Sequence, residues 1–154
     1  MALEVERRFL VDAPPGASML GPGIAICQGY LAEEGDVAVR VRITADDATL
    51  TVKAGAGIAR TEVEHLVDRD DAEALWRHTE GRRIEKVRHR VPTGSAVAEV
   101  DVFGGRLAGL CIVEVEFDDV DAAARFTPPP WFGREVTSDP RWSNASLARH
   151  GAPP

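Results

Sequence analysis

Hydrophobic and polar side chains alternate along most of this chain. In the stretch 3–11, Glu4, Glu6 and Arg8 occupy every second position and mostly apolar side chains lie between them. Such alternation is typical of a β-strand, in which successive side chains point to opposite faces. Clusters of Gly, Pro and Asp separate the alternating stretches as turns. The expected strands cover residues 3–11, 24–32, 37–44, 48–54, 59–68, 83–91, 96–103 and 110–118.

Three short helices are expected beside the strands. The most clearly marked one has Asp70 or Asp71 at its N-terminal cap and Gly81 directly after its end. A second one stops at a run of prolines, which cannot continue into a central strand. The expected helices cover residues 72–80, 121–126 and 144–150.

The polar positions of the expected strands carry charges of both signs. Glu4, Glu6 and Arg8 share one strand face, and same-face charged pairs recur in later strands. Buried like charges are costly unless opposite charges, metal ions or ligands neutralise them. A sheet face with rows of both signs is therefore a natural lining for a site that holds metal ions and a polyanion. The recurring pairs are Arg40 with Arg42, Glu62 with Glu64, Glu99 with Asp101, and Glu114 with Glu116.

Eight mostly antiparallel strands indicate a barrel or a strongly curved sheet. An ordinary small barrel fills its interior with apolar side chains. Here we expect the reverse arrangement, with apolar side chains packed outward beneath the helices and charged ones pointing inward.

Composition narrows the class of protein. The 154 residues are expected to form one domain over residues 1–154, and 44% of them are hydrophobic. The formal net charge of −7 argues against a nucleic-acid surface, and no apolar run approaches the roughly 20 residues of a membrane span. Cys27 and Cys111 lack metal-binding spacing and are expected to be reduced core residues of a cytoplasmic protein. Asn144 begins a formal glycosylation sequon, which has no meaning in that compartment.

Lysine is rare in this chain. Only Lys53 and Lys86 are lysines among 18 basic residues. An ammonium group is a compact point charge that can lose its proton, whereas a guanidinium is a fork that stays charged. Either the two positions are a chance outcome of the arginine bias, or both need a point charge in a confined site.

The sequence 3–11, LEVERRFLV, resembles the ExExK opening of the CYTH superfamily, the triphosphate tunnel metalloenzymes. The resemblance extends over nearly the whole chain, and the short bacterial inorganic triphosphatases are its nearest type. Arg8 replaces the usual lysine of ExExK and keeps its charge. Further matches follow in order: CQGYL (27–31), VRVR (39–42), LTVK (50–53), RTEVE (60–64), EGRRIEKVR (80–88), EVDVF (99–103), VEVEF (113–117) and WFGREVTSDPRWSN (131–144).

The resemblance implies an α+β, mainly β fold: an eight-stranded antiparallel tunnel-like barrel with a charged interior and a few flanking helices. It also implies a triphosphate substrate and a divalent cation, Mg²⁺ or Mn²⁺. The matching phosphate-binding cations are Arg8, Arg40, Arg42, Lys53, Lys86 and Arg88, with Arg60 a weaker candidate on the same face. The matching metal-binding carboxylates are Glu4, Glu6, Glu114 and Glu116, with Glu62, Glu64 and Asp101 in supporting positions.

The residues themselves agree with this chemistry. Guanidinium forks and ammonium groups suit phosphates, and carboxylate oxygens suit Mg²⁺ or Mn²⁺. We expect metal-assisted attack of water on a terminal phosphate of inorganic tripolyphosphate. Lys86 lies on a strand face with Arg88, and we expect it to act catalytically by orienting or deprotonating that water.

Three alternatives stay open at the level of sequence. The chain could be an adenylate cyclase, a thiamine or nucleoside triphosphatase, or a non-catalytic module that binds polyphosphate or nucleotides. A pure binder has little need for the complete carboxylate set, and the low aromatic content of 6% argues against a pocket for an organic group. The oligomeric state also stays open, a homodimer included.

Overall fold

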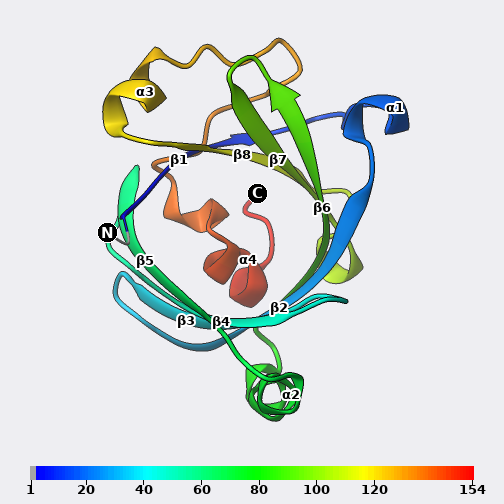
Figure 1. The fold of residues 1–154 in the computed structure, drawn as a ribbon, viewed down its shortest axis with the longest axis vertical. Coiled ribbons are helices and arrows are strands. Elements are labelled where there is room, and N and C mark those ends of the chain that lie inside the picture. Colours follow the sequence, from blue (N-terminus) through cyan, green and yellow to red (C-terminus); the bar gives the residue numbers. More distant parts are fainter. Residues whose placement is uncertain (1–2) are drawn as a thin grey trace.

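The computed structural model describes residues 3–154 and shows eight strands that close into one barrel (Figure 1). The strands follow each other around the barrel in the order β1-β5-β4-β3-β2-β6-β7-β8, and every neighbouring pair is antiparallel. The strands are β1 (Leu3–Leu10), β2 (Gly23–Glu34), β3 (Val37–Ile43), β4 (Ala48–Ala54), β5 (Ala59–Leu66), β6 (Arg83–Thr93), β7 (Ala96–Phe103) and β8 (Cys111–Phe117). The expected strands are confirmed, with ends that differ by at most two residues.

Short helices lie at the turns and around the barrel. Two of the expected helices are confirmed, since α3 begins one residue earlier than expected and α4 has the expected bounds. The four-residue helix α1 follows the Pro-Pro-Gly segment and was not expected. The helices are α1 (Ala17–Leu20), α2 (Arg69–Trp76), α3 (Val120–Arg125) and α4 (Asn144–His150), with 3₁₀ turns η1 (Arg77–Thr79), η2 (Gly105–Leu107) and η3 (Pro140–Trp142).

The expectation for the start of α2 was wrong. The helix begins at Arg69, so Asp68 occupies the N-cap position. Asp70 and Asp71 instead lie in the first turn, where their carboxylates face the positive end of the helix dipole. The chain then continues as the 3₁₀ turn η1, and Gly81 adopts a positive φ of 78° just after it.

The outer face of the barrel is apolar where other segments cover it. Val100, Val113 and Val115 point outward from β7 and β8 into a cluster with Phe9 and Phe132. A second cluster joins the wall to α2. The expectation that apolar side chains pack outward is therefore confirmed for these covered faces.

The exposure of Cys27 contradicts one expectation about this packing. Cys111 is buried, but Cys27 is exposed on the outer face of β2, and both are free thiols. The reason is strand parity: Gln28 and Tyr30 point inward, so the residue before them must point outward.

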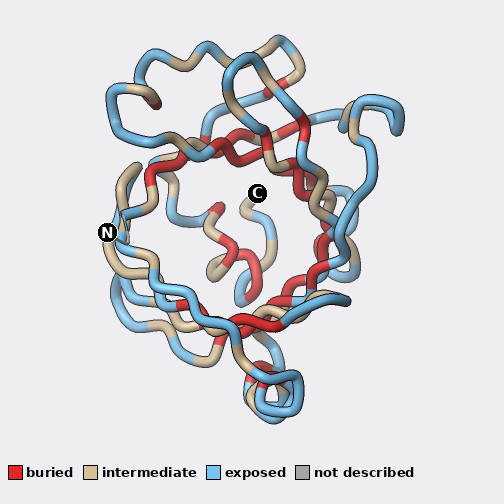
Figure 2. The backbone as a smooth tube through the Cα atoms, viewed as in Figure 1, coloured by how far each residue is buried: buried red, intermediate tan, exposed pale blue. Residues whose placement is uncertain are grey.

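The C-terminal segment lies inside the ring of strands (Figure 1). Trp142 and Leu147 pack against Tyr30, Ile84 and other inward-facing side chains in a buried cluster. Figure 2 shows this segment inside the barrel wall, with buried stretches in red beside exposed ones in pale blue. One end of the interior is thus apolar and filled by η3 and α4, which differs from the uniformly charged interior that the alternation predicts.

Among residues 3–154, no helix is both long and apolar enough to cross a membrane.

Candidate active site

The charged residues predicted from the sequence meet inside the barrel. In an antiparallel sheet, directly paired residues point to the same face, so the register decides which side chains meet. Glu6 pairs with Glu116 and Arg8 pairs with Glu114 between β1 and β8. Across the other joints the inward pairs are Glu4 with Arg60, Lys53 with Glu62, Thr51 with Glu64, Arg88 with Asp101, and Glu99 with Glu114.

Lys86, Arg88 and Asp101 form the most buried group of this interior. The side chains of Lys86 and Asp101 are completely buried, and their Nζ and Oδ2 atoms lie 2.7 Å apart. Arg88 donates to both oxygens of the same carboxylate, at 2.7 and 2.8 Å. Its neighbouring cations hold the pKa of Asp101 below its usual range, against the raising effect of burial.

The surroundings of Lys86 disfavour the charged form of its side chain. Burial lowers its pKa to about 7, and repulsion from Arg88 and Arg42 adds to this against the attraction of Asp101. Lys86 can therefore exchange a proton near neutral pH, which supports the chemistry expected for it from the sequence.

Arg42 and Arg40 extend the cationic side of the interior onto β3. Burial and repulsion from Arg40 and Arg88 lower the pKa of Arg42 to about 10. The Arg42 guanidinium donates to the side-chain oxygen of Gln28 at 2.8 and 3.1 Å. Arg40 is buried, and its Nε finds no hydrogen-bond acceptor among the described residues. This side is therefore crowded with positive charge that an anion would relieve.

Lys53 and Arg60 lie with the carboxylates of β1 and β5. Lys53 Nζ contacts Glu4 at 2.9 Å and Glu62 at 3.0 Å. Arg60 reaches Glu6 at 3.2 Å and Glu4 at 3.6 Å. Arg60 is thereby joined to the same network as the other predicted cations.

Arg8 occupies the position of the usual ExExK lysine and remains inside the site. It donates to Glu6 at 2.9 Å and to the carbonyl of Trp142 at 3.2 Å, and it lies 3.5 Å from Glu114. Its Nε, although buried, has no hydrogen-bond acceptor among residues 3–154. The arginine therefore keeps the positive charge at this place, and its Nε lies 3.5 Å from Glu114 Oε1 without forming a hydrogen bond.

The opposite side of the interior carries excess negative charge. Burial raises the pKa of Glu6 to about 7, and Glu114 adds to this. Burial followed by repulsion from Glu99 and Glu6 raises the pKa of Glu116, which is exposed. By contrast, Arg8, Arg88 and Lys86 hold the pKa of Glu114 well below its usual range although burial opposes them.

The four predicted metal ligands are adjacent but do not converge on one point. Glu4 faces Lys53, and Glu6 and Glu114 both face Arg8. Within the described part of the chain, no three His, Cys, Asp or Glu side chains form a ready-made metal site. The excess charge at Glu6 and Glu116 nevertheless fits a divalent cation, which prefers carboxylate oxygens.

The supporting carboxylates differ in their surroundings. Asp101 is fully buried, whereas Glu62 is half-buried beside Lys53 and Glu64 is exposed. Glu64 accepts from Thr51 at 2.9 Å and lies 3.8 Å from Arg40.

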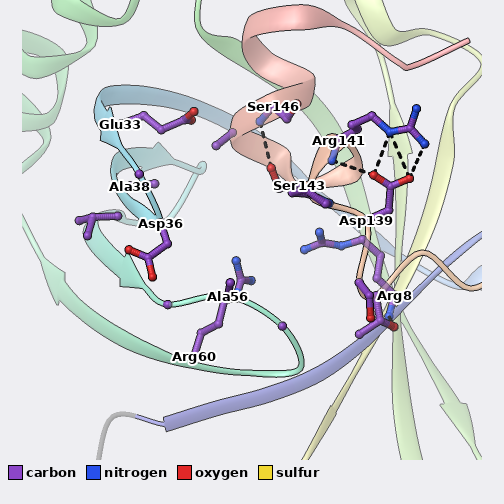
Figure 3. A pocket seen from close by; sticks show the side chains of 18 of the residues that line it. Arg8, Glu33, Asp36, Ala38, Ala56, Arg60, Asp139, Arg141, Ser143 and Ser146 are labelled. Carbon is purple, nitrogen blue, oxygen red and sulfur yellow. Dashed lines mark hydrogen bonds and ion pairs between the residues drawn. The ribbon is translucent and has the colours of Figure 1, made fainter.

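A cavity of about 610 Å³ opens beside α4 and reaches the charged interior. Glu6, Arg8 and Arg60 line its inner part, and the β2–β3 and β4–β5 hairpins face η3 and α4 across its mouth (Figure 3). Of the described residues that line it, none is aromatic.

Gln28 and Asn144 are among the polar residues of this interior that sequence reasoning missed. Gln28 is fully buried and connects Arg42 to the hydroxyl of Tyr30. Asn144 is buried and contacts both Lys86 and Glu114. The inward parity of β2 could have revealed Gln28, but the sequence carries no signal that a helix outside the sheet would place Asn144 in the tunnel.

Comparisons with known proteins agree with this architecture. An inorganic triphosphatase from Nitrosomonas europaea is 43% identical over 148 residues, which cover 94% of this chain and 96% of the relative. An inorganic triphosphatase from Acetivibrio thermocellus is 38% identical over 152 residues, covering 97% and 96%. No family model matches the chain.

Solved structures show the same fold. The crystal structure of an inorganic triphosphatase is 40% identical, covers 97% of this chain and 96% of its own, and has a TM-score of 0.70. A putative adenylyl cyclase from Hippeastrum, 14% identical, covers 80% of this chain and 83% of its own with a TM-score of 0.54. At that identity the likeness extends to the fold alone.

Proposed function

This chain belongs to the inorganic triphosphatases of the CYTH superfamily, and we propose that it hydrolyses inorganic tripolyphosphate to pyrophosphate and phosphate. One structural observation supports this function independently of the sequence similarity to known triphosphatases. Buried guanidinium and ammonium groups line a closed barrel, and the Nε atoms of Arg8 and Arg40 lack acceptors there among residues 3–154. A chain of phosphates offers the oxygens that these donors need.

The arginines and lysines of the interior would bind the phosphates in different ways. Arg40, Arg42 and Arg88 present guanidinium groups along β3 and β6, and the N–H groups that Gln28 and Asp101 do not use can donate to phosphate oxygens. Lys53 supplies a point charge from β4. Such fixed charges stabilise the transition state of phosphoryl transfer, in which positioning and electrostatics dominate.

A divalent cation, Mg²⁺ or Mn²⁺, fits the opposite side of the interior. Glu4, Glu6, Glu114 and Glu116 are the residues that would hold it, because their strands are adjacent and repulsion from neighbouring carboxylates contributes to the raised pKa of Glu6 and of Glu116. When bound, the ion supplies charge neutralisation for the phosphates and lowers the pKa of a bound water.

Lys86 is the residue that we propose for proton transfer. Its Nζ is held by Asp101, and its pKa of about 7 allows it to accept a proton from water at neutral pH. An arginine at this place would stay protonated and could only bind.

The cavity beside α4 favours an inorganic substrate over an organic triphosphate. A nucleoside or thiamine group needs an aromatic surface on which to stack, and none of the described residues that line this cavity is aromatic. The paired carboxylates favour an enzyme over a passive polyphosphate binder.

A single domain and a cytoplasmic location complete the proposal. Two free thiols support the reducing compartment.

A phosphate-release panel tests the function. Tripolyphosphate, ATP and thiamine triphosphate are each offered with Mg²⁺, with Mn²⁺ and with EDTA. We expect tripolyphosphate to be the best substrate, activity to vanish in EDTA, and either metal to restore it. Full activity in EDTA would contradict the metal, and a preference for ATP would contradict the substrate.

Carboxylate variants test the metal ligands in the same assay. Glu4→Gln, Glu6→Gln and Glu116→Gln keep the side-chain shape but remove the charge, and each should cut turnover about 10²-fold or more. Glu73→Gln, on an exposed position of α2, is the matched control and should leave turnover unchanged.

A further inference from the structure

Asn144 is the point at which the C-terminal segment enters the charged interior. It is the first residue of α4 and only 8% of its surface is exposed. Its side-chain oxygen accepts a hydrogen bond from Lys86 Nζ at 3.2 Å, and its side-chain nitrogen donates to Glu114 Oε1 at 3.4 Å. One small amide thus bridges a predicted proton-transfer residue and a predicted metal ligand.

The chemistry of the two partners fixes the orientation of the amide. An ammonium group only donates and a carboxylate only accepts, so the oxygen must face Lys86 and the nitrogen must face Glu114. An aspartate of the same shape would place a second carboxylate against Glu114. An alanine would leave both partners without this contact. Asn is the side chain of this size that serves both.

Lys86 needs a second restraint that Asp101 alone does not give. Both Asp101 oxygens are also occupied by Arg88, and the flexible lysine stem could let Nζ pivot about this shared carboxylate. Asn144 contacts Nζ from α4, whereas Asp101 contacts it from β7. Two partners on different elements define the position of the nitrogen.

The element that carries Asn144 is itself anchored at both ends. The Ser143 hydroxyl accepts from the Ser146 backbone N–H at 3.1 Å, which caps the helix (Figure 3). Arg106 donates to the carbonyls of Leu147 and Ala148 near the other end. Leu147 is fully buried among the apolar side chains of the barrel. The amide is therefore delivered by a fixed support.

We propose that Asn144 is a positioning residue for hydrolysis, which holds Lys86 Nζ and Glu114 at a set separation. This inference rests on the proposed triphosphatase function. It assigns to α4 a part in turnover, beyond filling one end of the barrel. Because Asn144 acts through its two partners, its loss should affect turnover more than substrate binding.

Steady-state kinetics of full-length variants on tripolyphosphate with Mg²⁺ test the proposal. We expect Asn144→Ala and Asn144→Asp to lower kcat by about 10–100-fold with a much smaller change in KM, as is usual for residues that orient a reacting group. Arg149→Ala is the matched control, because it changes an exposed position of the same helix and leaves the amide and the helix cap in place. It should leave kcat and KM near those of the wild type.

A double-mutant cycle with Lys86 separates positioning from packing. In the Lys86→Ala background, Asn144→Ala should cost far less than it does alone, because the nitrogen that it positions is gone. Wild-type kcat in Asn144→Asp, or equal losses in both backgrounds, would overturn the inference and leave the triphosphatase proposal standing. A wild-type protein that releases no phosphate would overturn both.

Discussion

At the scale of single residues, the two lysines hold different positions in the same network. Lys53 is shared by the carboxylates of Glu4 and Glu62, whereas Lys86 is completely buried beside Asp101. Only Lys86 has a pKa lowered to about 7, chiefly by burial. The proposed roles differ accordingly: Lys53 would supply a fixed charge, and Lys86 would supply a group that can lose its proton.

Arginine substitutions should separate these roles. Lys86→Arg keeps the charge but cannot accept a proton, so we expect kcat to fall about 10²-fold or more with substrate affinity largely kept. Lys53→Arg should lose less turnover and show its defect mainly in KM. Steady-state kinetics across pH check both variants, and near wild-type kcat in Lys86→Arg would reduce Lys86 to another phosphate clamp.

Glu6 should make the stability of the metal-free protein depend on pH. Its pKa is about 7 in the folded state, chiefly through burial, against 4.5 as the ordinary value. The folded state therefore binds the proton more tightly, and the resulting stability is full below pH 4.5 and is lost as the pH rises through about 7. The loss amounts to up to about 3 kcal/mol.

Thermal melts in EDTA at pH 5 and pH 7 measure this effect. Glu6→Gln cannot titrate, so its stability should change less between the two pH values than that of the wild type. Glu73→Gln, exposed on α2, should follow the wild type. Identical pH dependence in Glu6→Gln and the wild type would show that Glu6 is not the group responsible.

At the scale of elements, the alternation of polar and apolar residues predicted which face of each strand points inward. It predicted little about which segments pack against those faces. Every charge predicted to face the tunnel does so, because strand parity is a local property of the backbone. Parity also contradicts the expected burial of Cys27. The insertion of α4 into the barrel depends on contacts between distant parts of the chain, and no period in the sequence encodes it. Asn144 was missed for that reason.

Arg7 connects three such distant parts on the outer side of β1. It donates to both carboxylate oxygens of Glu135, at 2.7 and 3.0 Å, and to the carbonyls of Ala123 and Phe126 at the end of α3. We expect Arg7→Ala to lower the free energy of unfolding by about 2–3 kcal/mol, because these acceptors lose a charged donor.

Urea unfolding measures that change, and Arg141→Ala provides the contrast. The Arg141 side chain is 62% exposed and pairs only with Asp139 among the described residues, so its loss should destabilise the protein much less than the loss of Arg7. The folded Arg7→Ala protein should keep its kcat, since Arg7 points away from the tunnel. Equal destabilisation by both variants would contradict the connecting role of Arg7.

At the scale of the whole molecule, the barrel holds two charge excesses apart. Cations crowd β3 and β6, and carboxylates crowd β1 and β8. The ordered series of charged strands made this interior predictable from sequence, since the parity of many strands agrees. Its division into two sides follows from the ring order of the strands, which the sequence does not reveal.

Tripolyphosphate should therefore stabilise the folded protein. A ligand at 100 times its dissociation constant adds about 2.7 kcal/mol, which corresponds to a rise of roughly 5–10 °C in melting temperature for a chain of this size. Differential scanning fluorimetry in EDTA gives the value. Sodium sulfate at matched ionic strength should do much less, and equal shifts with both salts would mean that the effect is general to anions.

The closure of the ring has a consequence for how the molecule is made. β1 pairs with β5 over three residues and with β8 over six, from Val5 with Phe117 to Leu10 with Ile112. On the ribosome, β1 must wait while about a hundred further residues are synthesised before its longer partner exists. Contacts so far apart in sequence form slowly. Since β1 carries Glu4, Glu6 and Arg8, the nascent chain gains a complete tunnel only in this last pairing step.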